Sequence, residues 1–100
     1  MYGISAKSFQ LILDSIACVD KIEKAGIYGS RALGNFKNGS DVDLVIFGEK
    51  ITNNVLLKLK VKLEQELPIP YSFDLTHYET IKNIELKEHI DKFAQIIYPT

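Results

Sequence analysis

The chain has 100 residues, 46% of them hydrophobic and 25% charged, which suits one folded domain with a single core and excludes a multidomain or disordered protein. Its formal net charge of −1 excludes a global electrostatic attraction to nucleic acids or anionic membranes. No apolar run approaches the roughly 20 residues of a membrane span, no signal peptide is evident, and the single cysteine cannot form an internal disulfide, so we expect a cytoplasmic protein.

The first part of the chain predicts a helix followed by a strand. Ser5 is a suitable N-cap for a helix that we expect to end near Asp20. Its apolar side chains recur at helical spacing, at Phe9, Ile12, Leu13, Ile16 and Ala17. Lys24–Tyr28 then predicts a short strand, which Gly29 stops.

A turn and a loop separate this strand from a second one. Residues 30–33 allow at most one helical turn, and residues 35–40 form a polar loop that contains a glycine. Residues 41–47 are rich in residues that favour strands, and Gly48 closes the run. We therefore predict a second strand over 41–47.

A second helix is predicted after residue 52. Thr52 is a good N-cap, and Pro68 and Pro70 end the segment. An apolar stripe runs along it, at Leu56, Leu59, Leu63 and Leu67. Residues 58–63 also alternate with a period of two, as a strand would, but a sixteen-residue stretch without a turn signal favours the helix.

The last third of the chain predicts a strand, a helix and a short final strand. These are residues 71–75, Ile84–Phe93 and Gln95–Tyr98. The resulting order is α-β-β-α-β-α, with the final strand added at the end. We therefore expect one α/β (α+β) domain over residues 1–100, built as a small mixed β-sheet with helices packed on it.

Two aspartates occupy a strand that is otherwise apolar. Asp41 and Asp43 are two positions apart, so they share one face with Cα atoms about 6.6 Å apart, and the core side chains share the other. One interpretation is that both are solvated on the open face of an edge strand. Strands disfavour aspartate and like charges repel, however, so we favour a divalent cation such as Mg²⁺ between them.

Asp74 offers a third carboxylate. It lies in the predicted strand 71–75, with Phe73 and Leu75 on the opposite face. If this strand pairs with 41–47, facing residues are about 4.5 to 5.5 Å apart, and Asp74 can join the other two aspartates around one or two ions. A single aspartate near a strand end is also common, so that alternative stays open.

Gly29 and Ser30 follow a strand and open a helical turn. Backbone N–H groups and a hydroxyl in this position can hold an anion, and glycine lets a phosphate approach the backbone closely. Arg31 adds a cation for the phosphates. A plain turn and a surface arginine are the simpler alternatives. An anion site ten residues before a carboxylate pair, however, predicts binding of a metal-bound nucleoside triphosphate.

Gly29-Ser30, a spacer and the Asp-x-Asp of residues 41–43 resemble the signature of the DNA polymerase β nucleotidyltransferase superfamily. The fuller string GSRALG…SDVDLVIF is similar to its minimal nucleotidyltransferases. These are chains of about this length that are encoded beside a small helical partner, often as antitoxins of HEPN ribonuclease toxins. One departure is Ala94, where many relatives carry a glycine before the last strand.

The resemblance implies the polymerase β-like nucleotidyltransferase fold and a role for each site residue. Asp41 and Asp43 would hold two Mg²⁺ ions, and Asp74 would complete the second metal site and help deprotonate the attacking hydroxyl. Gly29 and Ser30 would hold the β and γ phosphates. The implied reaction is in-line transfer of a nucleoside monophosphate, AMP from ATP, to a hydroxyl, with pyrophosphate leaving.

The resemblance also implies a partner, because the chain is too short for the second domain with which larger members bind acceptor and base. We expect a HEPN toxin, whose tyrosine hydroxyl would receive AMP, or a four-helix-bundle substrate-binding subunit. The assembly would be a hetero-oligomer, with a homodimer left open. The alternative function is a non-catalytic antitoxin or binding module that covers a helical partner. The intact set of three acids favours the enzyme.

The two histidines receive no part in this site. His77 follows Asp74 closely, but we interpret it as a surface or partner-facing residue. His89 falls in the last predicted helix, where it needs no special role.

Overall fold

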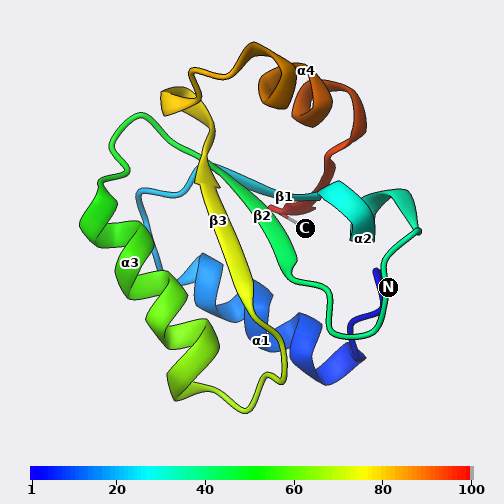
Figure 1. The fold of residues 1–100 in the computed structure, drawn as a ribbon. Coiled ribbons are helices and arrows are strands. Elements are labelled where there is room, and N and C mark those ends of the chain that lie inside the picture. The colour runs from blue at the N-terminus through cyan, green and yellow to red at the C-terminus, as the bar shows by residue number, and fades with distance from the viewer. Residues whose placement is uncertain (100) are drawn as a thin grey trace.

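Four strands form a single mixed sheet in the computed structural model, which describes residues 1–99 (Figure 1). The strands are β1 (Lys24–Tyr28), β2 (Val42–Phe47), β3 (Phe73–His77) and β4 (Gln95–Tyr98), in the spatial order β3-β2-β1-β4. β1 is antiparallel to β2 and β4, whereas β2 and β3 are parallel. Because β2 is an interior strand, the alternative that the two aspartates lie on an edge strand is wrong.

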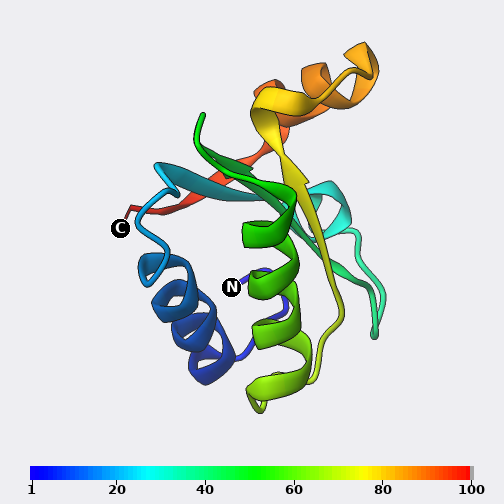
Figure 2. The same cartoon turned by 90° about the vertical axis from the view of Figure 1, so that its left-hand side faces the viewer.

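The helices lie on both sides of this sheet. α1 (Ala6–Ala17) and α3 (Asn53–Val61) pack side by side on one face, and α4 (Ile84–Phe93) lies over the other, with the short α2 (Gly29–Leu33) at the end of β1 (Figures 1 and 2). A π-helical turn at Lys62–Glu66 extends α3, and a 3₁₀ turn at Tyr78–Thr80 follows β3. No helix within residues 1–99 has the length and apolar character that crossing a bilayer requires.

Local signals placed most of these elements correctly. The Ser5 Oγ accepts a hydrogen bond from the Ser8 N–H, which confirms the N-cap of α1, and the Thr52 Oγ1 does the same for α3 with the Val55 N–H. The strands β1 and β4 and the helix α4 have the predicted bounds. Ala94 therefore does not prevent the last strand.

Three element boundaries differ from the predictions. α1 ends at Ala17 and not near Asp20. β2 begins at Val42, one residue later than predicted, so Asp41 precedes the strand. β3 spans Phe73–His77 and not 71–75, because its ladder with β2 begins where Val42 faces Phe73.

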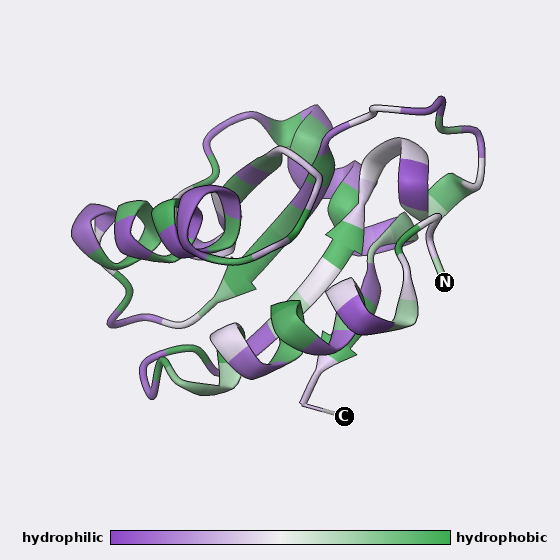
Figure 3. Ribbon diagram, turned by 90° about the horizontal axis from the view of Figure 1, so that it is seen from below, coloured by the Kyte–Doolittle hydropathy of each residue, from purple (hydrophilic) through white to green (hydrophobic). Residues whose placement is uncertain are grey.

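The hydrophobic core lies between the sheet and the α1–α3 layer. Val42, Leu44 and Ile46 are fully buried there, as their alternation in β2 predicts, and each contributes roughly 1.5 to 3 kcal/mol through its burial. Figure 3 shows hydrophobic and hydrophilic residues alternating along the helices, as expected for helices that cover a sheet on one side. The opposite face is partly covered too, because Val45 packs with Tyr28 and Ile90 of α4. α4 thus closes one end of the face that carries the aspartates.

Candidate active site

The pairing of β2 with β3 brings the three aspartates together. Asp43 of β2 faces Asp74 of β3 directly in the parallel register, and on its other side it faces Tyr28 of β1. Asp41 is exposed just before β2, two residues from Asp43, and Asp74 is exposed as well. Asp43 and Asp74 therefore lie side by side on the face of the sheet opposite the core, and Asp41 precedes them at the start of β2.

The charges of the three carboxylates are incompletely balanced by the protein. Burial raises the pKa of the half-buried Asp43, and the negative charges of Asp74 and Asp41 raise it further. Arg31 and His89 oppose this rise without cancelling it. Burial raises the pKa of the Tyr28 hydroxyl, and the negative charges of Asp74 and Asp43 raise it further. This hydroxyl forms a hydrogen bond with the Thr76 hydroxyl at 2.8 Å. The site therefore has an excess of negative charge.

The Gly-Ser turn lies against Asp43. Gly29 has φ +73°, in the left-handed region that favours glycine, and a Cβ placed there would collide with the Asp43 Oδ2. Ser30 follows it in the first turn of α2, where its carbonyl accepts hydrogen bonds from the N–H groups of residues 34 and 35. The absence of a side chain at Gly29 is thus what lets the turn and the carboxylate share this space.

Arg31 is buried beside the Gly-Ser turn and is hydrogen-bonded within the chain. It is only 3% exposed, and its Nε and Nη2 both donate to the Ser40 carbonyl, at 3.2 and 2.7 Å. Its Nη1 donates to the Tyr2 carbonyl at 2.9 Å, and the guanidinium lies over the rings of Phe36 and Tyr71. The alternative of a surface arginine is therefore wrong, and the guanidinium is hydrogen-bonded within the chain. Arg31 ties α2 to the loop that leads into β2.

His89 is a site residue that the sequence analysis missed. Its Nε2 accepts a hydrogen bond from the Gly29 N–H at 3.3 Å, although the two residues are 60 positions apart. The only sequence signal is helical spacing, which puts His89 on the same side of α4 as Leu86 and Phe93. Nothing local indicates that this side of α4 lies over the Gly-Ser turn.

His77 is not the surface residue that we expected. Its side chain is 9% exposed, and its Nε2 lies 2.6 Å from the Gly48 carbonyl and 3.2 Å from the Glu79 Oε1. It faces Ile46 at the opposite end of β2 from Asp43. His77 therefore stabilises the far end of the strand pair and takes no part in the site.

The residues of the site fit a hard divalent cation. They offer carboxylate oxygens, which Mg²⁺ prefers, and their charges are not balanced by the protein. Within residues 1–99, no three Asp, Glu, His or Cys side chains are arranged to hold a metal ion by themselves. Mg²⁺ usually keeps several waters and binds through one or two carboxylates together with substrate phosphates, so it does not require such a group.

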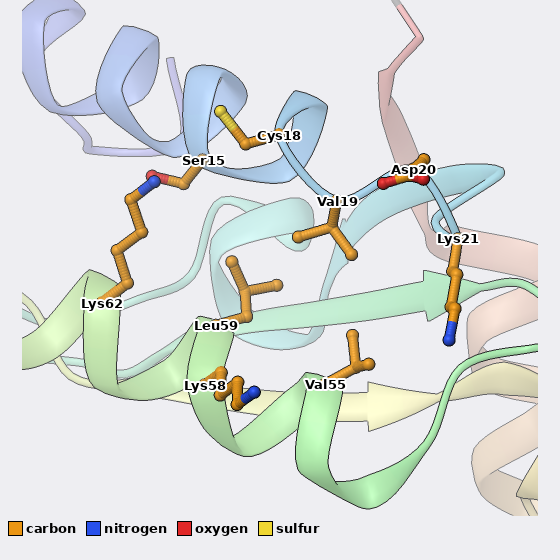
Figure 4. Close-up of a pocket in the computed structure, with 9 residues that line it drawn as sticks. All are labelled: Ser15, Cys18, Val19, Asp20, Lys21, Val55, Lys58, Leu59 and Lys62. Atoms are coloured by element: carbon orange, nitrogen blue, oxygen red, sulfur yellow. The ribbon is translucent and has the colours of Figure 1, made fainter.

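A separate hollow lies on the opposite side of the sheet. It has a volume of about 370 Å³ between α1 and α3, and in Figure 4 Lys62, the first residue of the π-helical turn after α3, extends toward Ser15 of α1. Its lining residues are Ser15, Cys18, Val19, Asp20, Lys21, Val55, Lys58, Leu59 and Lys62. None of them belongs to the aspartate cluster or the Gly-Ser turn, so the hollow is distinct from the candidate site.

Comparisons with known proteins identify the family of the chain and similar folds. Residues 11–100 match the sequence model of the family described as polymerase beta, nucleotidyltransferase. That range contains the Gly-Ser turn and all three aspartates. A comparison with curated protein sequences finds no significant match.

The fold is similar to that of solved toxin–antitoxin structures. The crystal structure of the toxin–antitoxin MntA–HepT matches with a TM-score of 0.71 and 15% identity, over 96% of this chain and 74% of that one. A toxin–antitoxin structure with AMP-PNP matches with a TM-score of 0.71 and 18% identity, over 94% and 73%. The tri-AMPylated Shewanella oneidensis HEPN toxin in complex with MNT antitoxin matches with a TM-score of 0.70 and 16% identity, over 94% and 71%.

Proposed function

The chain belongs to the polymerase β nucleotidyltransferase family and has the fold of that family. On this basis we propose that it transfers AMP from ATP to a hydroxyl group of a small helical partner protein. The observation that carries the proposal is the meeting of Asp43 and Asp74 on paired strands, with Asp41 beside them and Gly29 in contact with Asp43.

The proposed reaction needs few protein groups. The acceptor oxygen attacks the α-phosphorus of ATP, a new P–O bond forms, the bond to the bridging oxygen of the β-phosphate breaks, and pyrophosphate leaves. Asp74 is exposed and accepts the proton of the attacking hydroxyl, while Gly29 and Ser30 bind the β and γ phosphates. Two Mg²⁺ ions, bound by the three aspartates, would stabilise the charges on the attacking and leaving oxygens.

The nature of the partner is proposed from the similar structures. They are toxin–antitoxin complexes, one with AMP-PNP and one in which an AMPylated HEPN toxin is bound to an MNT antitoxin. We propose that a toxin of this kind, or a four-helix-bundle substrate-binding subunit, binds this chain in a hetero-oligomer and presents the hydroxyl. Because ATP is the proposed donor, we place the reaction in the cytoplasm.

A non-catalytic antitoxin or binding module that covers a helical partner is the second candidate. The raised pKa of Asp43 argues for the enzyme, because a pure binding module gains nothing from holding three carboxylates together at the expense of stability.

Label transfer distinguishes the two candidates. The protein is mixed with the partner encoded beside it, ATP labelled in the α-phosphate, and Mg²⁺. We expect label on the partner, and loss of that label with the D41N/D43N double variant. The control is D20N, which removes an exposed carboxylate of the opposite, hollow-lining side. The enzyme proposal fails if no protein or RNA acceptor is labelled and if D41N/D43N still neutralises the partner.

A further inference from the structure

The contact between α4 and the Gly-Ser turn has a specific donor and acceptor. The Gly29 N–H donates to the Nε2 of His89 at 3.3 Å. The residues lie on elements that are far apart in the sequence, and α2 and α4 pack against each other. A side chain of the last helix therefore fixes the backbone of the turn proposed to bind the triphosphate.

The imidazole is held in place by its neighbours. Its ring centroid lies 5.2 Å from that of Phe93 and 6.3 Å from that of Tyr28, which it meets edge to face at 73°. His89 is half-buried, and the adjacent Ile90 anchors α4 with only 2% exposure. Because the ring is packed on two sides, its orientation is fixed and its Nε2 stays directed at the Gly29 N–H.

The hydrogen bond acts on the glycine of the site. Gly29 has a positive φ, and glycine loses more conformational freedom on folding than any other residue. Its N–H precedes the first turn of α2, where the helix offers it no acceptor. Without His89, neither the position of Ser30 nor the contact of Gly29 with Asp43 would be held from the α4 side.

We propose that His89 is a positioning residue that holds the Gly29-Ser30 turn in the geometry that binds the triphosphate. The inference rests on the proposed function and deepens it, because it assigns to the same nucleotide site a residue from outside the Gly-Ser and Asp-x-Asp segments. The opposite role is that the ring blocks the Gly29 N–H until the nucleotide displaces it. The two roles predict opposite changes in nucleotide affinity when the acceptor is removed.

A pair of substitutions separates the acceptor from the ring. H89F keeps an aromatic ring against Tyr28 and Phe93 but has no acceptor atom, whereas H89Q loses the ring and places an amide oxygen near the position of Nε2. The control is E88Q, an exposed neighbour on α4. All are made in the full chain, and their melting temperatures are compared first.

Two measurements test the role. Calorimetry with Mg²⁺-ATP gives the affinity, and we expect H89F to weaken it about fivefold, which corresponds to the net contribution of about 1 kcal/mol of one hydrogen bond. H89Q restores most of the affinity, and E88Q changes nothing. In the label-transfer assay, KM for ATP rises in H89F while kcat stays within about twofold, as expected for lost ground-state positioning.

Amide hydrogen exchange without nucleotide tests the contact itself. We expect the Gly29 N–H to be protected in the native chain and in H89Q, and to exchange faster in H89F. The proposal is overturned if H89F binds Mg²⁺-ATP as tightly as the native chain or more tightly, or if H89Q fails to rescue. If H89F does not fold, the native chain is still a test, because an unprotected Gly29 N–H in the native chain is sufficient to refute the proposal. A native chain that does not bind Mg²⁺-ATP refutes the proposed function, and the role of His89 falls with it.

Discussion

Replacing Asp43 by asparagine removes one charge from the aspartate cluster at almost constant volume. Asp43 faces Asp74 across β2 and β3, and side chains in such pairs are about 5 Å apart. Two unit charges at that distance repel by about 0.8 kcal/mol in water and about 3 kcal/mol at an effective dielectric constant of 20. Because Asp74 is exposed, solvent screening favours the lower end of this range.

We therefore expect D43N to be more stable than the native chain when no divalent cation is present. The expected gain in the free energy of unfolding is about 1 kcal/mol at neutral pH, which raises the melting temperature by about 5 °C in a domain of this size. Because the pKa of Asp43 is raised in the folded protein, the penalty that its charge imposes is absent below the unfolded pKa and appears as pH rises through the folded pKa. The advantage of D43N thus shrinks as the pH falls through the folded pKa of Asp43, and it disappears below the unfolded pKa.

Urea unfolding in EDTA, at neutral and acidic pH, measures this difference. High salt reduces the gain in the free energy of unfolding. D74N also raises the free energy of unfolding, but by less, because Asp74 is exposed. The gain of the D43N/D74N double variant is smaller than the sum of the two single gains, because both remove the same repulsion. With Mg²⁺-ATP the order reverses, because a ligand that binds the folded native chain stabilises it. The reasoning is refuted if D43N is less stable in EDTA at neutral pH, or if its gain does not depend on pH.

Two further predictions follow from backbone and side-chain contacts near the cluster. G29A is expected to lose about 2 to 3 kcal/mol in urea unfolding and to lose Mg²⁺-ATP binding, because a Cβ there has both a positive φ and a collision with Asp43. G34A is the matched control, since its φ is also positive but a Cβ would meet no atom within 4 Å, so a loss as large as that of G29A contradicts the collision. R31K is expected to lower the free energy of unfolding by about 2 kcal/mol, because lysine cannot reproduce the two hydrogen bonds that Arg31 donates to the Ser40 carbonyl. An unchanged melting temperature would contradict the role of Arg31 in holding α2 against the loop before β2.

The sequence determined the features that depend on near neighbours. Hydroxyl N-caps at Ser5 and Thr52 begin helices because their partners are three residues away. The alternation of residues 42–46 decided which side of β2 enters the core and therefore that Asp43 lies on the other. The spacing of the Gly-Ser and Asp-x-Asp segments indicated the family, which the match over residues 11–100 confirms.

The tertiary structure decided which distant residues meet. The parallel register of β2 and β3 puts Asp74 beside Asp43, and β2 is an interior strand only because β3 adds to its outer edge. Arg31 is buried because carbonyls from the N-terminal segment and from the 35–40 loop converge on it. His89 reaches Gly29 because α4 packs over the end of β1. Such contacts depend on how whole elements pack, and a local pattern contains no signal for the packing partner.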